Sequence, residues 1–299
     1  MISIPKDRHV FALAADAPPV VRVPDGAVVE LEPADCFSDQ VRRPGDTLGS
    51  VDWEQINPAT GPVYVEGARP GDVLAVHIER IEIDRQGVMA VSDGFGVLAE
   101  RFTQTEERLV PVVDGVVRLA DGVEVPARPM IGVLGVAPSG EAVPTGTPGS
   151  HGGNLDTVLV CEGATVYLPV SAPGALLAAG DLHAAMGDGE ICGTGVEVAG
   201  RVTLRLTTRR DLRIVNPIVE TPEVVATVAS AETLDEATTL ATRDMADLLM
   251  GRLGLTAAAA TMLMSAAGDL RVSQVVDPLK TARFTLAKDL LAPYGRPLV

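Results

Sequence analysis

Aromatic residues and cysteines are both scarce in this chain of 299 residues. It has one Trp, three Tyr and five Phe, so surfaces on which bases or sugars stack are poorly supplied. The three cysteines, Cys36, Cys161 and Cys192, are widely spaced and form no Cys-x-x-Cys pair. A disulfide framework and a cysteine-rich zinc site are therefore not expected, and three free thiols fit a reducing cytoplasm.

Basic residues are also in deficit, and long apolar runs are missing. Lys and Arg together number 24 against 40 Asp and Glu, which gives a net charge of −16. Nucleic acids and anionic membranes attract basic surfaces, so we expect neither as a partner. The sequence contains no run of about 18 apolar residues, so we expect no membrane-spanning helix. Residues 1–7 lack the apolar region of a secretory signal. We therefore expect a cytoplasmic protein.

Most of the chain has the pattern of short β-strands. Residues 20–220 are dense in valine and are interrupted by Gly, Pro and Asp at short intervals. Residues 76–83 alternate apolar and polar side chains, as a half-buried strand does. Asp114-Gly115 stands between two valine pairs and predicts a hairpin turn.

Helical periodicity is found only near the C-terminal end. Thr233 opens a capping box, and apolar residues then recur on one helix face up to Gly251, which can close the helix. Thr256 can cap a second helix that ends near Gly268. The short link between them predicts a helical hairpin packed on the sheets.

These patterns predict a β-dominant α+β fold with stacked mixed or antiparallel sheets and a C-terminal helical hairpin. We expect a single unit over residues 1–299. Its parts would be a β-rich region at 1–228, the helical hairpin at 230–268 and an extended tail at 269–299.

Two polar clusters carry the chemical information. Residues 151–156 read HGGNLD, and residues 180–190 read GDLHAAMGDGE. Histidines and carboxylates together can bind a metal or move protons, and neighbouring glycines let a ligand approach the backbone closely. This combination predicts a site rather than an ordinary surface.

The spacing inside the second cluster indicates how its side chains can converge. Asp181 and His183 are two residues apart, so in a strand they share one face with Leu182 buried behind them. Asp188 and Glu190 repeat this spacing, and a hairpin of the two stretches would line one face with four polar side chains. His151 and Asp156 would approach from the glycine-rich loop. One or two histidines with two or three carboxylates suit zinc, manganese or iron, whereas more carboxylates favour calcium or magnesium.

A structural interpretation stays open for several of these residues. Asp-Gly pairs are common in turns, so the clusters could be turns and hydrogen-bonded core groups. Asp35 could reach a site or could simply form a turn at a strand end. Cys36 lies among acidic residues that would raise its pKa, so we do not favour it as a nucleophile.

Several stretches of the chain resemble the acetamidase/formamidase family. Besides the two polar clusters, they are residues 58–68 (PATGPVYVEGA), 70–74 (PGDVL), 129–138 (PMIGVLGVAP) and 265–278 (SAAGDLRVSQVVDP). The resemblance spans nearly the whole chain in the same order. Residues 157–162, TVLVCE, depart from the polar stretch found in many members, which would favour a different amide if this segment touches the substrate.

The resemblance implies hydrolysis of a small linear amide, such as formamide or acetamide, to ammonia and a carboxylate. It also implies a β-rich fold and a homodimer or higher homo-oligomer. The site residues carried over by matching position are His151, Asn154, Asp156, Asp181, His183, Asp188 and Glu190.

A mechanism follows from the chemistry of these residues. No activated serine or cysteine is visible, so we expect a metal-bound water to attack the amide. We assign Asp156, Asp181 and His183 as ligands, with Asp188 as a further candidate, and zinc as the ion, with calcium or manganese as alternatives. Glu190 would be the general base. The oxyanion would be stabilised by Asn154 with glycine amides, and His151 would be a further ligand or an acid.

Two other interpretations remain. The same scaffold could hydrolyse a bulkier amide, a cyclic amide or an amidine. Alternatively, the chain could be a non-enzymatic β protein that binds a metal or another ligand, in which case the ion would have no open coordination position.

Overall fold

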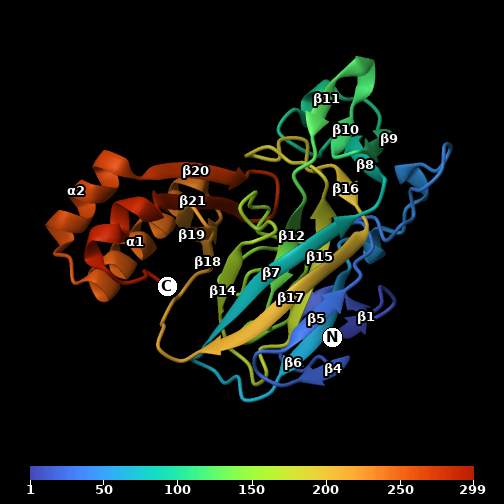
Figure 1. Ribbon diagram of the computed structural model, residues 1–299. Helices are drawn as coiled ribbons and strands as arrows, with labels where there is room; N and C mark the ends of the chain where they lie inside the picture. The colour runs from blue at the N-terminus through green and yellow to red at the C-terminus, as the bar shows by residue number, and fades with distance from the viewer.

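Two large β-sheets form the frame of the molecule (Figure 1). The computed structural model describes residues 1–299, except for the side chain of Asp121. The first sheet has nine strands in the order β1 (Ile2–Ile4), β5 (Val28–Leu31), β17 (Gly200–Arg209), β7 (Val73–Ile83), β14 (Thr165–Pro169), β18 (Ile218–Glu220), β19 (Val224–Ala231), β21 (Lys280–Ala287) and β20 (Asp269–Gln274).

The second sheet holds the segment that builds the site. Its main path runs β11 (Glu124–Pro126), β10 (Val116–Arg118), β9 (Glu106–Val113), β8 (Gln86–Val91), β16 (Glu197–Val198), β15 (Leu177–His183), β6 (Ala59–Val65) and β2 (His9–Val10). β12 (Met130–Gly135) also pairs with β15, and β4 (Val21–Val23) pairs with β6. Two short strands, β3 (Ala12–Leu13) and β13 (Val143–Pro144), pair separately.

Strand pairing is mostly antiparallel, with parallel pairs at β1–β5 and β4–β6. The expected hairpin forms between β9 and β10, where Asp114 and Gly115 both have positive φ, as a two-residue hairpin turn requires. Short 3₁₀ helices connect other segments: η1 (Leu48–Ser50), η2 (Trp53–Gln55), η3 (Ala99–Arg101), η4 (Ala120–Gly122) and η5 (Lys288–Tyr294). The mixed, mainly antiparallel β architecture is as predicted.

Aliphatic side chains fill the space between the two sheets. Val29 and Leu204 of the first sheet belong to the same buried cluster as Val63 and Leu177 of the second. The described buried members of this cluster include no aromatic side chain. A chain poor in aromatics thus builds its largest core from closely packed Val, Leu, Ile and Ala.

The two helices pack beside the C-terminal strands of the first sheet (Figure 1). In α1 (Leu234–Leu253), the Thr233 hydroxyl accepts a hydrogen bond from the Glu236 amide, as predicted. In α2 (Ala257–Ala267), Thr256 caps in the same way, and Gly268 ends the helix. The expected end of α1 at Gly251 is wrong, because the helix continues to Leu253 and closes at Gly254 with φ 73°. No helix in the described part of the chain is long and apolar enough to cross a membrane.

The C-terminal tail is more ordered than an extended segment. β20 and β21 pair with each other as a hairpin, and β21 also pairs with β19. Hydrogen-bonded pairing therefore makes residues 269–287 the edge of the first sheet. The loop between these two strands reaches the site described below.

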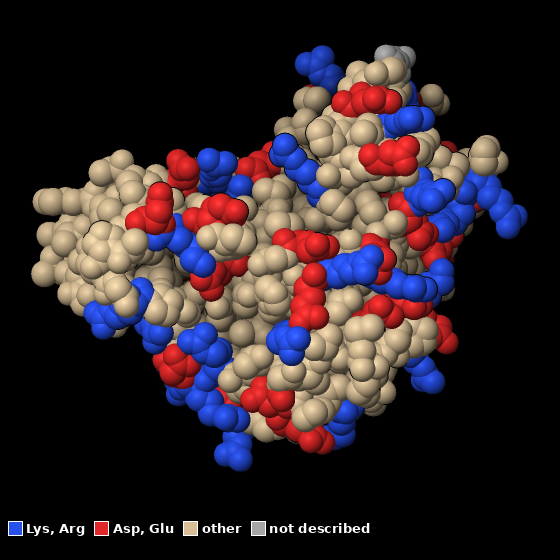
Figure 2. Space-filling model, viewed as in Figure 1, with Lys and Arg blue, Asp and Glu red and all other residues tan. Residues whose placement is uncertain are grey.

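Charged residues are mixed over the surface. On the face in Figure 2, Asp and Glu are interspersed with Lys and Arg, and the described residues of this face form no continuous basic patch. This arrangement fits the net charge of −16.

Candidate functional site

The site begins at the end of β15. Every residue of this strand is buried, and Leu182 is fully buried, as the spacing predicted. The hairpin considered between residues 181–183 and 188–190 does not form. Instead, β15 pairs with β16, which places His183 opposite Glu197. The segment between the two strands contains Gly187, Gly189, Gly193 and Gly195, and this glycine-rich segment forms a loop rather than a continuing strand.

Gly132 of β12 leaves room for two carboxylates, those of Asp156 and Asp181. A Cβ added at Gly132 would lie 2.5 Å from an oxygen of Asp156 and 2.5 Å from an oxygen of Asp181. The amide of Leu155 donates to the carbonyl of Gly132, which fixes the loop carrying Asp156 against this strand. Only glycine leaves space for both acids at this position.

Three acids of the site have strained backbones. Asp156, Asp181 and Glu190 have φ values of 40°, 57° and 45°. Non-glycine residues in this region cost on the order of 1–3 kcal/mol each, and such strain concentrates at functional sites. These backbone conformations therefore lower the stability of the fold, and they set the direction in which the three side chains point.

Four carboxylates surround one imidazole nitrogen. The distances from Nε2 of His183 are 3.2 Å to Glu197 Oε1, 3.5 Å to Asp181 Oδ1, and 3.9 Å to both Asp156 Oδ1 and Glu190 Oε1. Neither nitrogen of His183 has a hydrogen-bond partner among the described atoms, and both carboxylate oxygens of Asp156 also lack one. Two ligands of one zinc ion, bound at about 2.1 Å in tetrahedral geometry, are roughly 3.4 Å apart. These atoms thus fit a cation between them better than they fit each other.

Burial and mutual repulsion shift the protonation of these groups. Burial raises the pKa of Glu197 to about 7, with His183 acting against this rise and Asp181 adding to it. Burial, followed by neighbouring carboxylates, raises the pKa of Asp156 and of Glu190 well above the usual range. Burial alone would lower the pKa of His183, but Glu197 and Asp181 raise it well above its usual value. Asp156, Glu190 and His183 therefore all favour their protonated forms when no other cation lies among them.

Asp277 completes the site from the other sheet, and sequence reasoning missed it. Its Oδ2 accepts a hydrogen bond from Nδ2 of Asn154 at 3.2 Å. The amides of Val276 and Asp277 both donate to Oε1 of the buried Gln274, which fixes the loop after β20. The family-like stretch at residues 265–278 contains Asp277 and could have identified it as a site residue. The sequence pattern instead placed Asp277 in an extended tail.

Glu197 was also missed, although it is the acid nearest to His183. The segment Val196-Glu197-Val198 has the alternation of a half-exposed strand, which would place the acid in solvent. The strand is instead covered on both faces, and Glu197 is 1% exposed. Only the register of β15 with β16 reveals its place.

Cys36 reaches the same cavity from the N-terminal part of the chain. Its Sγ groups with a ligand atom of Asp181 and one of Glu197, all within 4.8 Å of one another. Burial and these two acids raise the pKa of the thiol well above its usual value, as the sequence predicted. Asp35, by contrast, accepts hydrogen bonds from the amides of Phe37 and Asp39 and so forms the turn of this loop.

Two residues expected at the site lie apart from this group. Both oxygens of Asp188 bind the guanidinium of Arg283, at 2.9 and 2.7 Å, so this acid has a cation of its own. His151 is buried, and burial alone lowers its pKa to about 4, with no contribution from a carboxylate. The structure therefore does not bring Asp188 or His151 into the group around His183.

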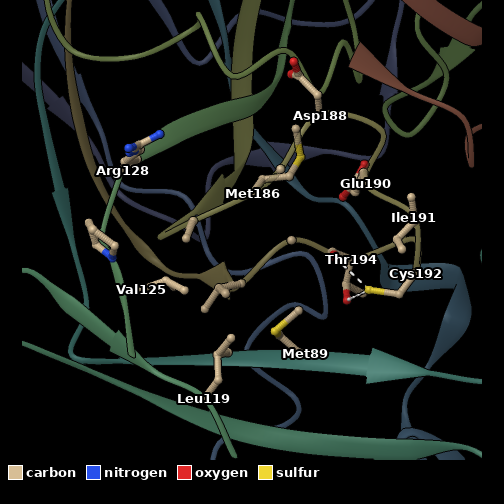
Figure 3. Close-up of a pocket in the computed structure, with 15 residues that line it drawn as sticks. Met89, Leu119, Val125, Arg128, Met186, Asp188, Glu190, Ile191, Cys192 and Thr194 are labelled. Carbon is tan, nitrogen blue, oxygen red and sulfur yellow. Dashed lines mark hydrogen bonds between the residues drawn. The ribbon is translucent and has the colours of Figure 1, made fainter. Parts of the chain in front are cut away.

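The group opens into a cavity of about 510 Å³. Asn154, Asp181, Glu190, Glu197 and Asp277 line it, together with apolar side chains that include Phe37, Trp53 and Phe95. A second, mostly apolar cavity of about 610 Å³ shares Glu190 and Thr194 with it. In Figure 3, Glu190 and Thr194 lie on one side of this second cavity, and Leu119 and Val125 lie on the opposite side.

The family of the chain follows from a match that covers most of its length. The model of the acetamidase/formamidase family matches residues 12–146 and 140–289. The chain belongs to this family. The match includes Cys36, both polar clusters and Asp277, so every acid of the group around His183 lies within the family region.

Solved acetamidase/formamidase structures have the same fold. A protein described as a predicted acetamidase/formamidase from Thermoanaerobacter tengcongensis is 48% identical with a TM-score of 0.96, and the match covers 98% of each chain. An acetamidase from Bacillus halodurans is 47% identical with a TM-score of 0.96, covering 99% of this chain and 100% of that one.

More distant family members include curated relatives. A formamidase from Methylophilus methylotrophus is 27% identical over 276 residues, covering 71% of this chain and 68% of the relative. A relative from Schizosaccharomyces pombe is 28% identical over 253 residues, and the chain spans 61% of its length. The chain thus spans about two thirds of the length of these curated acetamidase/formamidase relatives.

Proposed function

We propose that this protein hydrolyses a small linear amide to ammonia and a carboxylate in the 510 Å³ cavity. The observation that carries this proposal is the ring of acids around Nε2 of His183. Both nitrogens of His183, both carboxylate oxygens of Asp156 and Oε2 of Glu197 lack hydrogen-bond partners among the described residues. The formamidase and acetamidase names of the relatives support the class of reaction.

A divalent cation fits between Asp156, His183 and Glu190. One ligand atom of each lies within 4.8 Å of the other two, and all three side chains are buried. The sequence-based hypothesis placed Asp181 in this set and made Glu190 the base, whereas the mutual distances favour Glu190 as a ligand. When bound, such an ion lowers the pKa of its water and polarises a carbonyl.

Asp277 is then the acid best placed as general base. It lines the cavity, and burial followed by Glu190 and Asp181 raises its pKa well above the usual range. A carboxylate of raised basicity can take a proton and pass it to departing ammonia. Nδ2 of Asn154 donates one of its two hydrogens to Asp277. The second hydrogen can be donated to the amide oxygen of a substrate in the cavity.

Zinc is the first proposal for the ion, with manganese or calcium as alternatives. Histidine nitrogen and carboxylate oxygen are both zinc ligands, and sites with several carboxylates also suit manganese and calcium. A cytoplasmic homo-oligomer stays a prediction, and sedimentation of the purified protein would give its oligomeric state.

A bulkier amide or amidine is the second candidate substrate. The apolar cavity of about 610 Å³ meets the polar one at Glu190 and Thr194. An apolar substituent of a larger substrate could occupy it while the amide stays among the acids.

The experiment is ammonia release from formamide, acetamide and larger amides, with protein as purified, after chelation, and after zinc is restored. We expect release that chelation abolishes and zinc restores. His183→Ala should lose bound zinc and lower kcat/KM by at least about 100-fold. His77→Ala is the matched control, because His77 is hydrogen-bonded to Thr165 in the other sheet and lies outside the group around His183. This variant should keep its zinc and its turnover.

Three results would count against this proposal. Unchanged zinc content and turnover in His183→Ala would remove the assignment of the site. Release from larger amides alone would favour the second candidate. Stoichiometric zinc with no release from any amide would leave a metal-binding protein without this activity.

A further inference from the structure

We propose that the cavity binds a second divalent cation, held by Sγ of Cys36 and the carboxylates of Asp181 and Glu197. It would lie beside the ion proposed at Asp156, His183 and Glu190. The inference rests on the proposed function for the first ion and extends it to a two-metal centre.

The geometry of this second group is that of a metal site. One ligand atom each of Cys36, Asp181 and Glu197 lies within 4.8 Å of the other two. Glu197 is 1% exposed, and its Oε2 has no hydrogen-bond partner among the described atoms. Zinc binds sulfur at about 2.3 Å and oxygen at about 2.0–2.2 Å, so three atoms within 4.8 Å of one another are within reach of one ion.

Cys36 is otherwise hard to explain at this position. A thiol is a weak hydrogen-bond donor and carries no positive charge, so it does little to offset two adjacent carboxylates. A coordinated thiol is deprotonated and becomes a strong ligand. Because sulfur is a soft donor, its presence would select zinc over magnesium or calcium.

The number of acids also favours more than one ion. Five carboxylates lie close together: Asp181, Glu190, Glu197 and Asp277 line the cavity, and Asp156 is buried beside them, 3.9 Å from Nε2 of His183. None of them forms an ion pair with Lys or Arg within the described part of the chain, and Lys280 donates to the main-chain carbonyl of Asp277 rather than to its side chain. Metal binding displaces the protons that these acids otherwise keep. With all five acids deprotonated in this way, one divalent ion would balance two of the five charges, and a second would balance four. Unbalanced buried charges are costly, so two ions fit the group better.

The two proposed ligand sets are contiguous. Asp181 and Glu197 of the second set lie 3.5 and 3.2 Å from Nε2 of His183 in the first. Paired catalytic metals are separated by about 3.5–4 Å, a spacing that such neighbouring sets permit. The second set lines the cavity that also contains Asn154 and Asp277, and the first set reaches this cavity through Glu190.

The test is the metal content and the cobalt spectrum of the full-length protein. Metal-free protein is reconstituted with Zn²⁺ and, separately, with Co²⁺. We expect two ions per chain and a near-ultraviolet thiolate-to-cobalt charge-transfer band. Cys36→Ser should lose the band and one of the two ions. Cys161→Ser and Cys192→Ser, at thiols outside the group, should keep both ions and the band.

The outcomes separate this inference from the proposed function. One ion per chain in the wild type, without the band, overturns the second site and leaves amide hydrolysis intact. A band that persists in Cys36→Ser also overturns it. Two ions with the Cys36-dependent band, but no ammonia release from any amide, would support the second site and refute the proposed function. The cobalt spectrum of the wild type gives this answer even if a variant does not fold.

Discussion

Two acid-rich regions of the molecule differ in how their charges are balanced. In the outer region, Asp39 binds Lys6 and lies 3.2 Å from Nη1 of Arg42, whose Nη2 lies 3.0 Å from Asp84. In the inner region, the acids around His183 meet no Lys or Arg side chain among the described residues. The outer charges are thus balanced within the chain, whereas the inner acids have no such partner in the described part of it, and a balancing cation is what the proposed metal would supply.

Removing the proposed metal ions should have the largest effect on stability and on turnover. A ligand present at about 1,000 times its Kd stabilises the folded state by about 4 kcal/mol. We expect chelation to lower the unfolding temperature by several degrees and to abolish turnover, with zinc restoring both. Calorimetry with and without chelator measures the shift. An unfolding temperature that chelator leaves unchanged would mean that the inner acids are not balanced by metal.

Breaking the pair between Asp188 and Arg283 should have the next largest effect. Arg283 is 2% exposed, and Asp188→Asn would leave its charge without a partner. Removing one member of a buried pair costs about 3–5 kcal/mol, and we expect about 2–3 kcal/mol because the side chain of Asp188 is 36% exposed. Urea unfolding measures the loss. A loss below about 1 kcal/mol would show that solvent already balances Arg283.

Adding one methyl group at Gly132 should disturb the inner region specifically. In Gly132→Ala the new Cβ would overlap Asp156 and Asp181, and overpacking typically costs about 1–3 kcal/mol. We expect this loss together with a lower metal content. Gly251→Ala is the matched control, because no atom lies within 4 Å of its added Cβ and it stands inside α1. That variant should instead gain up to about 1 kcal/mol. Equal zinc binding by both variants would contradict the role of Gly132.

Breaking an outer pair should have the smallest effect. Asp84 has a side chain that is 46% exposed, and its partner Arg42 also contacts Asp39. Exposed ion pairs contribute about 0–1 kcal/mol, so Asp84→Asn should change the free energy of unfolding by less than about 1 kcal/mol. Zinc content should be unchanged. A metal loss in this variant would show that the two regions are coupled.

The sequence was sufficient for features that depend on local spacing. The helix caps at Thr233 and Thr256, the turn at Asp114-Gly115 and the buried Leu182 all follow from patterns within a few residues. Asp181 and His183 could be placed together for the same reason, because both belong to one strand.

Features that depend on tertiary register could not be read in this way. Glu197 meets His183 only because β16 pairs with β15, and Asp277 reaches Asn154 only because Gln274 fixes a loop of the other sheet. Asp188 has the same local signals as Glu190, yet Arg283, nearly a hundred residues later, binds one and not the other. Sequence spacing identifies candidate acids, and the choice among them is made by distant partners.

The group around His183 draws its side chains from Cys36 near one end of the chain to Asp277 near the other. During synthesis on the ribosome, a nascent chain has all but one of these acids before Asp277 and the strand after it have emerged. Contacts between such distant segments form slowly, because the loop between them must close first. The group around His183 is therefore completed late in folding. An ion held at the proposed site would gain its full set of surrounding side chains only after the C-terminal strands have docked on the sheet.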